Sequence, residues 1–329
     1  MYKIARPLFL HCQTAMHAGT GDDLGIVDLP IQREKHTGYP KIEASGLKGA
    51  IRESFEENAT SVADRVKLHV AFGYDEKDAS RKPSITDEFK DKESRDFAGT
   101  IGFTDARIVL FPLKSLKGIF AYATCPSVLK KLKQELQDIC QLSITIETDF
   151  NSIDVTKVAV ANASHLSSNN KAILEEYSFD CSDTDLNKKA KELAKQLNEI
   201  LGITDLENKL VVLEDDTFAD FVKNSTEVVT RIKIDNETGT VAKGALFTEE
   251  YLPTECVMYS LVLASNVFAP SKKDKFDKGE YLSVMNYFAD TLNNVIQIGG
   301  NATLGKGIVK TIKTQLKQSN DGDTATTQA

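Results

Sequence analysis

The chain has 329 residues, of which 41% are hydrophobic and 27% are charged, a composition typical of a globular protein with a sizeable core. It contains no run of about 18 apolar residues and no signal-peptide-like apolar segment, so we expect neither a membrane span nor a membrane partner. The net charge of −8 argues against nucleic-acid binding but does not exclude it, because a basic groove can lie on an acidic body.

The cysteines are scattered and form no Cys-x-x-Cys pair, which argues against a zinc site. Their odd number argues against a disulfide framework. A reducing, cytoplasmic location is therefore the simplest expectation. The five residues are Cys12, Cys125, Cys140, Cys181 and Cys256.

In the first part of the chain, alternating apolar residues predict a strand over 3–16. A long loop punctuated by glycine and proline is expected over 17–42. A helix capped by Ser45 is predicted over 45–57. Residues 75–96 are rich in charge and have no apolar period, which predicts a solvated, mobile insertion.

In the rest of the chain, helical and strand periods alternate. Helices are predicted over 128–140, 185–201 and 280–297, and strands over 101–111, 228–234, 240–247, 256–264 and 308–314. The turn at Asp235–Gly239 joins two of these strands into a hairpin. A polar tail over 318–329 is expected to be disordered. The pattern predicts a single α+β domain over 1–317 rather than a doubly wound parallel sheet.

The loop over residues 17–34 contains most of the residues suited to chemistry, including three glycines and three aspartates. Glycine lets backbone N–H groups approach an anion, so this loop could cradle phosphates. It lacks the Gly-Lys-Ser/Thr ending of a P-loop, and a mobile loop with turn glycines is an equally good interpretation.

Asp28 follows Ile26-Val27 and precedes Leu29-Pro30, so apolar residues flank it closely. Such an aspartate could bind a divalent metal or position an attacking hydroxyl, or it could simply cap a turn. His17 could act as a general acid or base, although a hydrogen bond that orders the loop is the more common role. Asp22 and Asp23 are expected to be exposed turn residues.

Basic residues recur at three further places. Lys48 and Arg52 lie four apart on the predicted helix and could grip a nucleic-acid backbone, or form a solvated face. The second glycine loop, 299–307, could place Lys306 on a phosphate. The predicted hairpin carries Arg231 and Lys233 and could insert into a partner, or be an ordinary surface ribbon.

Together these segments resemble the backbone RAMP subunits of type III-B (Cmr) CRISPR effector complexes. The matching motifs, which span residues 8 to about 312, are His17-Ala-Gly-Thr-Gly, Val27-Asp28-Leu29-Pro30-Ile31-Gln32-Arg33-Glu34, Thr37-Gly38-Tyr39-Pro40, Ser45-Gly46-Leu47-Lys48-Gly49-Ala50-Ile51-Arg52, Phe103-Thr104-Asp105-Ala106, Phe111-Pro112, Leu116-Lys117-Gly118, Arg231-Ile232-Lys233-Ile234-Asp235, Gly244-Ala245-Leu246-Phe247-Thr248-Glu249-Glu250 and the loop 299–307. Each motif is weak alone, but their combination and order are specific.

The resemblance implies an RRM-like (ferredoxin-like) palm with a thumb β-hairpin inserted at about 225–255 and helical or finger insertions, one of them the charged segment at about 60–100. Copies of such a subunit stack in a filament along the guide crRNA, beside other Cmr-complex subunits. Each thumb wedges into the guide–target duplex, and the complementary target RNA is cut at regular intervals. The implied cofactor is a divalent metal, Mg²⁺ or Mn²⁺.

The resemblance also assigns residues to roles. Asp28 and His17 are the catalytic candidates, and Asp28 is the metal ligand. The RNA-binding candidates are Gly19, Gly21, Ser45, Lys48, Arg52, Gly300, Asn301 and Lys306, and the thumb candidates are Arg231, Lys233, Leu246, Phe247 and Glu250.

Four alternatives remain open at this stage. A type III-A backbone subunit shares the fold and the chemistry, and the run 32–38 and the chain length favour the Cmr type over it. A non-catalytic, structural RNA-binding subunit is the second, and Asp28 argues against it. A guide-processing ribonuclease of the same superfamily would rely on a histidine, and a glycine-loop nucleotide-binding enzyme is poorly supported.

Overall fold

A computed structural model describes residues 2–21, 25–90 and 95–313, and it is a mixed α+β fold. Asp22, Asp23 and the predicted tail lie outside the described residues. In the described part of the chain, no helix is both long and apolar enough to cross a bilayer. All five cysteines are free and buried, which agrees with the prediction from their spacing.

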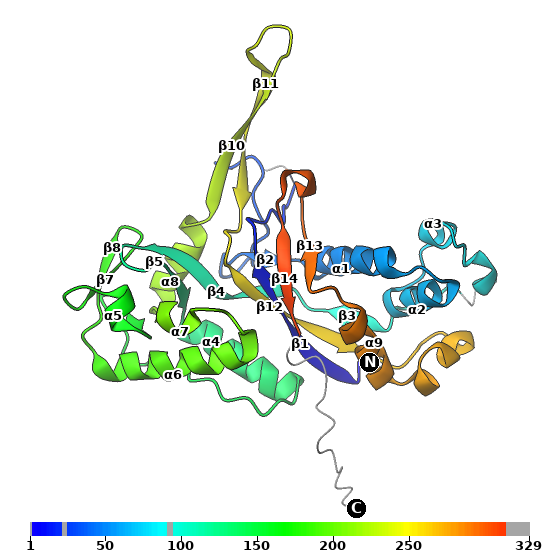
Figure 1. Cartoon of the computed structure of the whole chain (residues 1–329), viewed down its shortest axis with the longest axis horizontal. Helices are drawn as coiled ribbons and strands as arrows, with labels where there is room; N and C mark the ends of the chain where they lie inside the picture. The colour runs from blue at the N-terminus through cyan, green and yellow to red at the C-terminus, as the bar shows by residue number, and fades with distance from the viewer. Residues whose placement is uncertain (1, 22–24, 91–94, 314–329) are drawn as a thin grey trace, which may run out of the picture.

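The elements alternate along the chain as Figure 1 shows. The strands are β1 (Ile4–Cys12), β2 (Lys41–Ile42), β3 (Ile101–Phe103), β4 (Ala106–Ser115), β5 (Ile119–Thr124), β6 (Ala159–Val160), β7 (Lys171–Leu174), β8 (Tyr177–Asp180), β9 (Leu210–Val212), β10 (Glu227–Ile234), β11 (Val241–Tyr251), β12 (Val257–Ala264), β13 (Val295–Gln297) and β14 (Ile308–Ile312). The α-helices are α1 (Ala44–Asn58), α2 (Val62–Phe72), α3 (Glu76–Ala79), α4 (Pro126–Gln134), α5 (Ala163–Leu166), α6 (Thr184–Leu201), α7 (Leu206–Lys209), α8 (Asp215–Asn224) and α9 (Tyr281–Thr291).

The centre of the molecule is an antiparallel sheet in the order β14-β1-β12-β4, with β3 also paired to β12. β13 extends this sheet beyond β14, and β5, β9 and β6 extend it beyond β4. Helix α1 follows β1 in the chain and α9 follows β12. β5 and β9 run parallel, whereas the other named strand pairs are antiparallel.

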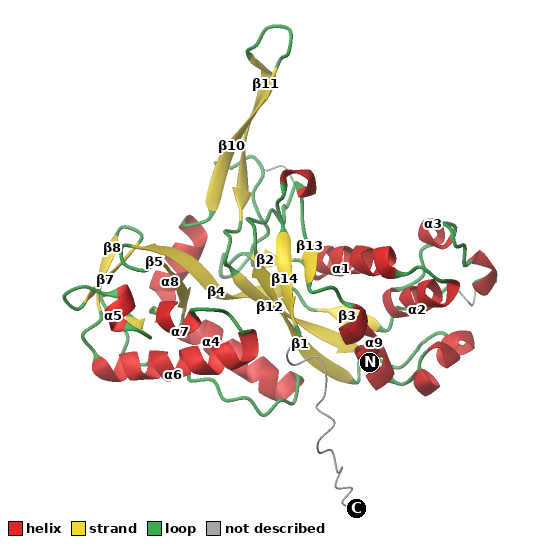
Figure 2. Cartoon of the chain, viewed as in Figure 1, coloured by secondary structure: helices red, strands yellow, loops and turns green. Residues whose placement is uncertain are grey.

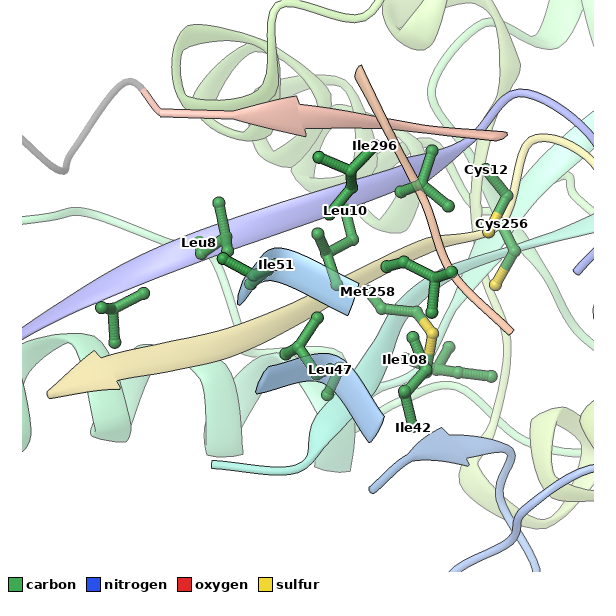
Figure 3. Close-up of a cluster of buried hydrophobic side chains, with 14 of the residues drawn as sticks. Leu8, Leu10, Cys12, Ile42, Leu47, Ile51, Ile108, Cys256, Met258 and Ile296 are labelled. Atoms are coloured by element: carbon green, nitrogen blue, oxygen red, sulfur yellow. The ribbon is translucent and has the colours of Figure 1, made fainter. Parts of the chain in front are cut away.

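Both faces of β1 are buried, because helices cover the sheet on each side. On one face, Leu47 and Ile51 of α1 pack against Leu8 and Leu10 (Figure 3). On the other face, Phe9 belongs to a second core formed with α4 and α6. Fully burying one leucine or isoleucine contributes about 1.5–3 kcal/mol, so this layered core holds β1 and the loop that leaves it in a fixed position.

The prediction that the segment 75–96 is solvated is wrong for part of it. Ile85 and Phe89 in this segment are fully buried, and Phe89 lies against the rings of His69 and Tyr74. Asp78 is also buried and accepts a hydrogen bond from Nε2 of His69 at 2.7 Å. The sequence did not reveal this packing, because the few apolar residues of the segment are irregularly spaced among charged ones. Several of the charged side chains form ion pairs with each other.

Two helix ends also differ from the prediction. Helix α1 begins at Ala44 with Glu43 as its N-cap, so Ser45 lies within the first turn and caps nothing. Helix α9 ends at Thr291, and strand β13 occupies the last part of the predicted helix 280–297. Apolar residues continue from the helix into this short strand, and the period alone does not mark the change.

The predicted hairpin is confirmed and is longer than expected. β10 and β11 form a separate two-stranded sheet that projects from the body of the molecule (Figures 1 and 2). Arg231 pairs with Phe247, and the register shifts between Ile232 and Ile234. Apolar residues on the projecting part are exposed, with Leu246 reaching 66%, so the hairpin contributes little to the core.

Candidate functional site

The loop that carries Asp28 is bonded along the foot of the hairpin. Leu29 forms a parallel bridge with Glu249 of β11. Its N–H donates to the carbonyl of Thr248 at 3.0 Å, and its carbonyl accepts from the N–H of Glu250 at 3.0 Å. The loop after β1 and the base of the hairpin therefore form one unit, although more than 200 residues separate them in the chain.

Asp28 is exposed and is oriented by a single residue. Its Oδ2 accepts hydrogen bonds from the backbone N–H of Thr248 at 2.6 Å and from the Thr248 hydroxyl at 2.8 Å. The same hydroxyl accepts from the Asp28 N–H at 3.0 Å. These bonds, the backbone one first, lower the pKa of Asp28 below its usual value. Within the described residues Oδ1 has no hydrogen-bond partner, so an ionised oxygen faces solvent.

His17 lies in a tight setting at the start of the same loop. Its Nδ1 donates to the carbonyl of Glu250 at 2.7 Å, and its ring centroid lies 5.6 Å from that of Tyr251. A Cβ on Gly19 would lie only 2.4 Å from Nε2 of His17. Glycine is therefore needed at position 19 for the loop to pass over the imidazole.

The two glycine loops meet at His17. The N–H of Gly300 donates to the carbonyl of His17 at 2.9 Å. Gly299 has a φ of +83°, and a Cβ there would lie 2.2 Å from the same carbonyl oxygen. Glycine at position 299 thus permits close approach of one loop's backbone to the other.

Glu249 is the centre of a polar cluster behind His17. It accepts from Nδ2 of Asn301 at 2.6 Å and from the hydroxyl of Tyr251 at 2.5 Å, and Nε of Arg231 lies 3.3 Å away. Burial opposes ionisation of Glu249, but the Tyr251 and Asn301 bonds and nearby positive charge keep its pKa below the usual value. Nζ of Lys306 lies 4.8 Å from the centroid of the Tyr251 ring.

Glu250 lies at the foot of the hairpin and is buried. Its Oε1 accepts from Arg33 at 2.5 Å and from the Thr226 hydroxyl at 2.6 Å, and its Oε2 accepts from the N–H of Ile31 at 3.0 Å. This carboxylate ties the Asp28 loop to the hairpin. The other thumb candidates, Lys233, Leu246 and Phe247, are exposed on the projecting strands.

Lys48 and Arg52 lie apart from this cluster on α1 and differ from each other. Lys48 is half-buried, and burial followed by the charge of Arg52 lowers its pKa. Within the described residues no carboxylate lies within 4.0 Å of Lys48. Arg52 instead pairs with Glu56 at 2.7 Å and donates to the carbonyl of Gly73 at 3.0 Å. Lys48 is therefore the better placed of the two for a phosphate.

The structure thus brings together some predicted residues and separates others. Around Glu249 and Tyr251 lie the candidates His17, Gly19, Gly300, Asn301, Lys306 and Arg231, with Asp28 attached through Thr248. Ser45 is exposed on α1 and Gly21 is exposed on the loop. The prediction missed Thr248, Glu249 and Tyr251 as site residues. The sequence did contain a signal for these residues, because two carboxylates and a tyrosine come at the end of a predicted strand that contains apolar residues.

Known proteins resemble the chain over nearly its full length. A model of the RAMP superfamily matches residues 9–310. The chain belongs to this superfamily. Among curated proteins, the CRISPR system Cmr endoribonuclease Cmr4 of Pyrococcus furiosus is 33% identical over 318 residues, covering 96% of this chain and 97% of the relative. The Cmr4 subunit of Saccharolobus solfataricus is 28% identical and covers 94% and 96%.

Solved structures of Cmr4 and of a Cmr complex also resemble this chain over nearly its full length. Oligomeric Cmr4 from Pyrococcus furiosus matches with a TM-score of 0.67 at 28% identity, over 93% of this chain and 96% of that one. A chain of a type III-B Cmr-beta complex bound to cognate target RNA matches with a TM-score of 0.68 at 25% identity, over 94% and 97%. The resemblance to the Cmr backbone subunits is therefore confirmed.

Proposed function

We propose that this chain is the guide-RNA-binding backbone subunit of a type III-B effector complex and that it cleaves complementary target RNA with Asp28. The observation that carries the proposal is the exposed Asp28 carboxylate, oriented by Thr248 on a loop that is bonded to the foot of the hairpin. The family membership and the relative named as an endoribonuclease support the reaction class.

The proposed reaction is attack of a ribose 2′-hydroxyl on its adjacent phosphate. It requires the nucleotide to be unstacked so that the hydroxyl and the leaving oxygen lie in line. The hairpin is suited to this task, because it projects from the body (Figure 1), exposes apolar side chains such as Leu246, and is bonded at its foot to the Asp28 loop. Asp28, being ionised, can accept a proton or hold a cation beside the phosphate.

A divalent metal, Mg²⁺ or Mn²⁺, is part of the proposal. The described residues include no cluster of three His, Cys, Asp or Glu side chains that could hold a metal. Asp28 offers one carboxylate oxygen that accepts no hydrogen bond from the described residues, which fits a cation that keeps several waters and binds one carboxylate plus substrate phosphate oxygens. When bound, such a cation would offset the charge that develops on the phosphate.

The proposal also covers the type of fold that the central sheet forms, the palm, and the partners of the chain. The order β14-β1-β12-β4, with α1 after β1 and α9 after β12, supports an RRM-like, ferredoxin-like palm. The expected partners are guide crRNA, complementary target RNA, further copies in a filament and other Cmr-complex subunits, acting in the cytoplasm. The similar structures described as oligomeric and as bound to target RNA support these partners.

The direct test is to assemble the complex with this chain and a guide of known sequence. A labelled complementary RNA should yield products at a constant spacing, whereas a non-complementary RNA should remain intact. Gel analysis of the products measures both. Uncut complementary RNA in an assembled, metal-supplied complex would favour the structural, non-catalytic alternative.

Thr248→Val should raise the pKa of Asp28 and reduce cleavage. The substitution removes the hydroxyl that donates to Oδ2 but keeps the backbone bond. Activity that needs ionised Asp28 is present above its pKa and is lost as the pH falls through it, so the acid limb should move to higher pH. The pH profile of cleavage by the assembled complex measures this shift. Thr248→Ser, which keeps the hydroxyl, should restore the original profile; identical profiles for all three proteins would refute the role of Thr248.

Lys48→Ala should weaken guide binding without sequence preference. If Lys48 contacts a phosphate, the log–log dependence of affinity on salt should flatten by roughly 0.7 for a single strand. Lys195→Ala, at an exposed lysine of α6, is the matched control and should leave the slope unchanged. Arg52→Ala should mainly lower stability, because Arg52 joins α1 to the end of α2. An unchanged salt slope for Lys48→Ala would show that Lys48 is not a phosphate contact.

A further inference from the structure

An aromatic cleft of about 520 Å³ lies between the β7–β8 turn and α8, just before β10 begins. Its floor is apolar, with Phe179 and Phe221 buried at a centroid distance of 6.2 Å. Tyr177 stands at the edge with 63% of its surface exposed, and its ring meets Phe221 edge-on at 5.6 Å. An exposed tyrosine supported by a buried ring is typical of the centre of a protein interface.

Carboxylates form both walls of the cleft. Glu175 and Glu176 lie on the β7–β8 turn, and Asp216 and Asp220 lie on α8. Glu175 accepts a hydrogen bond from the N–H of Lys114 at 2.8 Å. In contrast, no lysine or arginine among the described residues lies within 4.0 Å of the carboxylates of Glu176, Asp216 and Asp220.

This arrangement concentrates negative charge at the mouth of the cleft. Asp216 and Asp220 are four residues apart on one helix, where like charges repel. Glu176 adds a third charge from the opposite wall. No lysine, arginine or histidine of the described chain lines the cleft, so its walls present unpaired negative charge that a cationic partner would complement.

We propose that the cleft binds an arginine-bearing segment of a partner protein. A guanidinium can stack on the exposed face of Tyr177 and donate to carboxylates on both walls at once. Arginine suits this site better than lysine, because its planar group combines stacking with forked hydrogen bonds. The like charge of phosphate argues against RNA here. The hairpin of a second copy is a poorer occupant, because its Arg231 is already bonded to Glu249 and Tyr251.

The test uses the full-length chain and a fluorescein-labelled peptide, Gly-Arg-Leu-Gly-Arg-Leu-Gly-Arg, with fluorescence anisotropy as the readout. A peptide with citrulline in place of arginine is the neutral control and should not bind. The triple variant E176Q/D216N/D220N should raise the dissociation constant by about tenfold or more. The variant D185N/E192Q/E199Q removes the same number of exposed carboxylates from α6 and should change it by less than about twofold.

Two more variants separate ring stacking from charge. Tyr177→Phe keeps the ring and should bind the arginine peptide normally, whereas Tyr177→Ala should weaken binding. Absence of peptide binding, or an equal loss in the α6 variant, would overturn the proposal. It would also fail if the triple variant abolished self-association in sedimentation velocity, which would identify a second copy as the occupant, or if single-stranded RNA competed for the cleft. RNA cleavage by the assembled complex is measured separately, because this inference does not rest on it.

Discussion

Asp28→Ala should abolish cleavage of target RNA by the assembled complex and leave assembly and target binding nearly intact. Asp28 is exposed and bonds only to Thr248 among the described residues, so its loss removes no core packing. Losing a positioned acid–base group alone lowers the rate by about 10²–10⁴, and loss of a cation site would add to this. Single-turnover rates of product formation, beside guide and target affinities, measure the effect.

Two comparisons make this experiment specific. Asp185→Ala removes an exposed carboxylate from α6 and should leave the cleavage rate unchanged. His17→Ala should have a smaller effect than Asp28→Ala, because His17 is enclosed by Glu250, Tyr251 and the second glycine loop and mainly orders the loop. Full cleavage by a complex built only from Asp28→Ala copies would disprove the catalytic role.

Elements with a strong apolar period were predicted well. The strand at β1, the helix α6 and the hairpin β10–β11 all follow from alternation or helical spacing and from clear turn or cap residues. The short strands β6 to β9 were missed because each has at most four residues, which is too few to establish a period. The buried part of 75–96 was missed because packing there depends on His69, from a preceding helix.

The site was predicted only in part, for a related reason. Asp28 and His17 were found because glycines and carboxylates cluster in one loop of the sequence. Thr248 and Glu249 contact that loop although more than 200 residues separate them from it in the chain. A local sequence pattern does not indicate contacts between residues so far apart. For Arg52 a local pattern was present but misleading. The spacing of Arg52 from Lys48 indicated a shared surface, but the Arg52 guanidinium donates to the carbonyl of Gly73 instead.

Shortening the hairpin should leave the isolated subunit folded and eliminate regularly spaced cleavage. The suitable variant joins Arg231 to Phe247, which face each other in the register, through an Asn-Gly turn that matches the strand twist. It removes residues 232–246 but keeps Thr248, which orients Asp28. The apolar side chains lost are exposed ones such as Leu246, so the thermal unfolding midpoint should change little.

The expected loss of cleavage follows from the cost of opening a duplex. Displacing one nucleotide costs a few kcal/mol, and without the projecting strands nothing offsets this cost beside Asp28. A full-length control, I234S/V241S, keeps the hairpin but removes apolar side chains near its turn, and it should weaken cleavage without changing the spacing of products. Product sizes and rates, measured with assembled complexes of known stoichiometry, distinguish these outcomes. If the shortened variant assembled and cut at the same positions, the hairpin would not position the target, and Asp28 would have to reach its phosphate without help from β10 and β11.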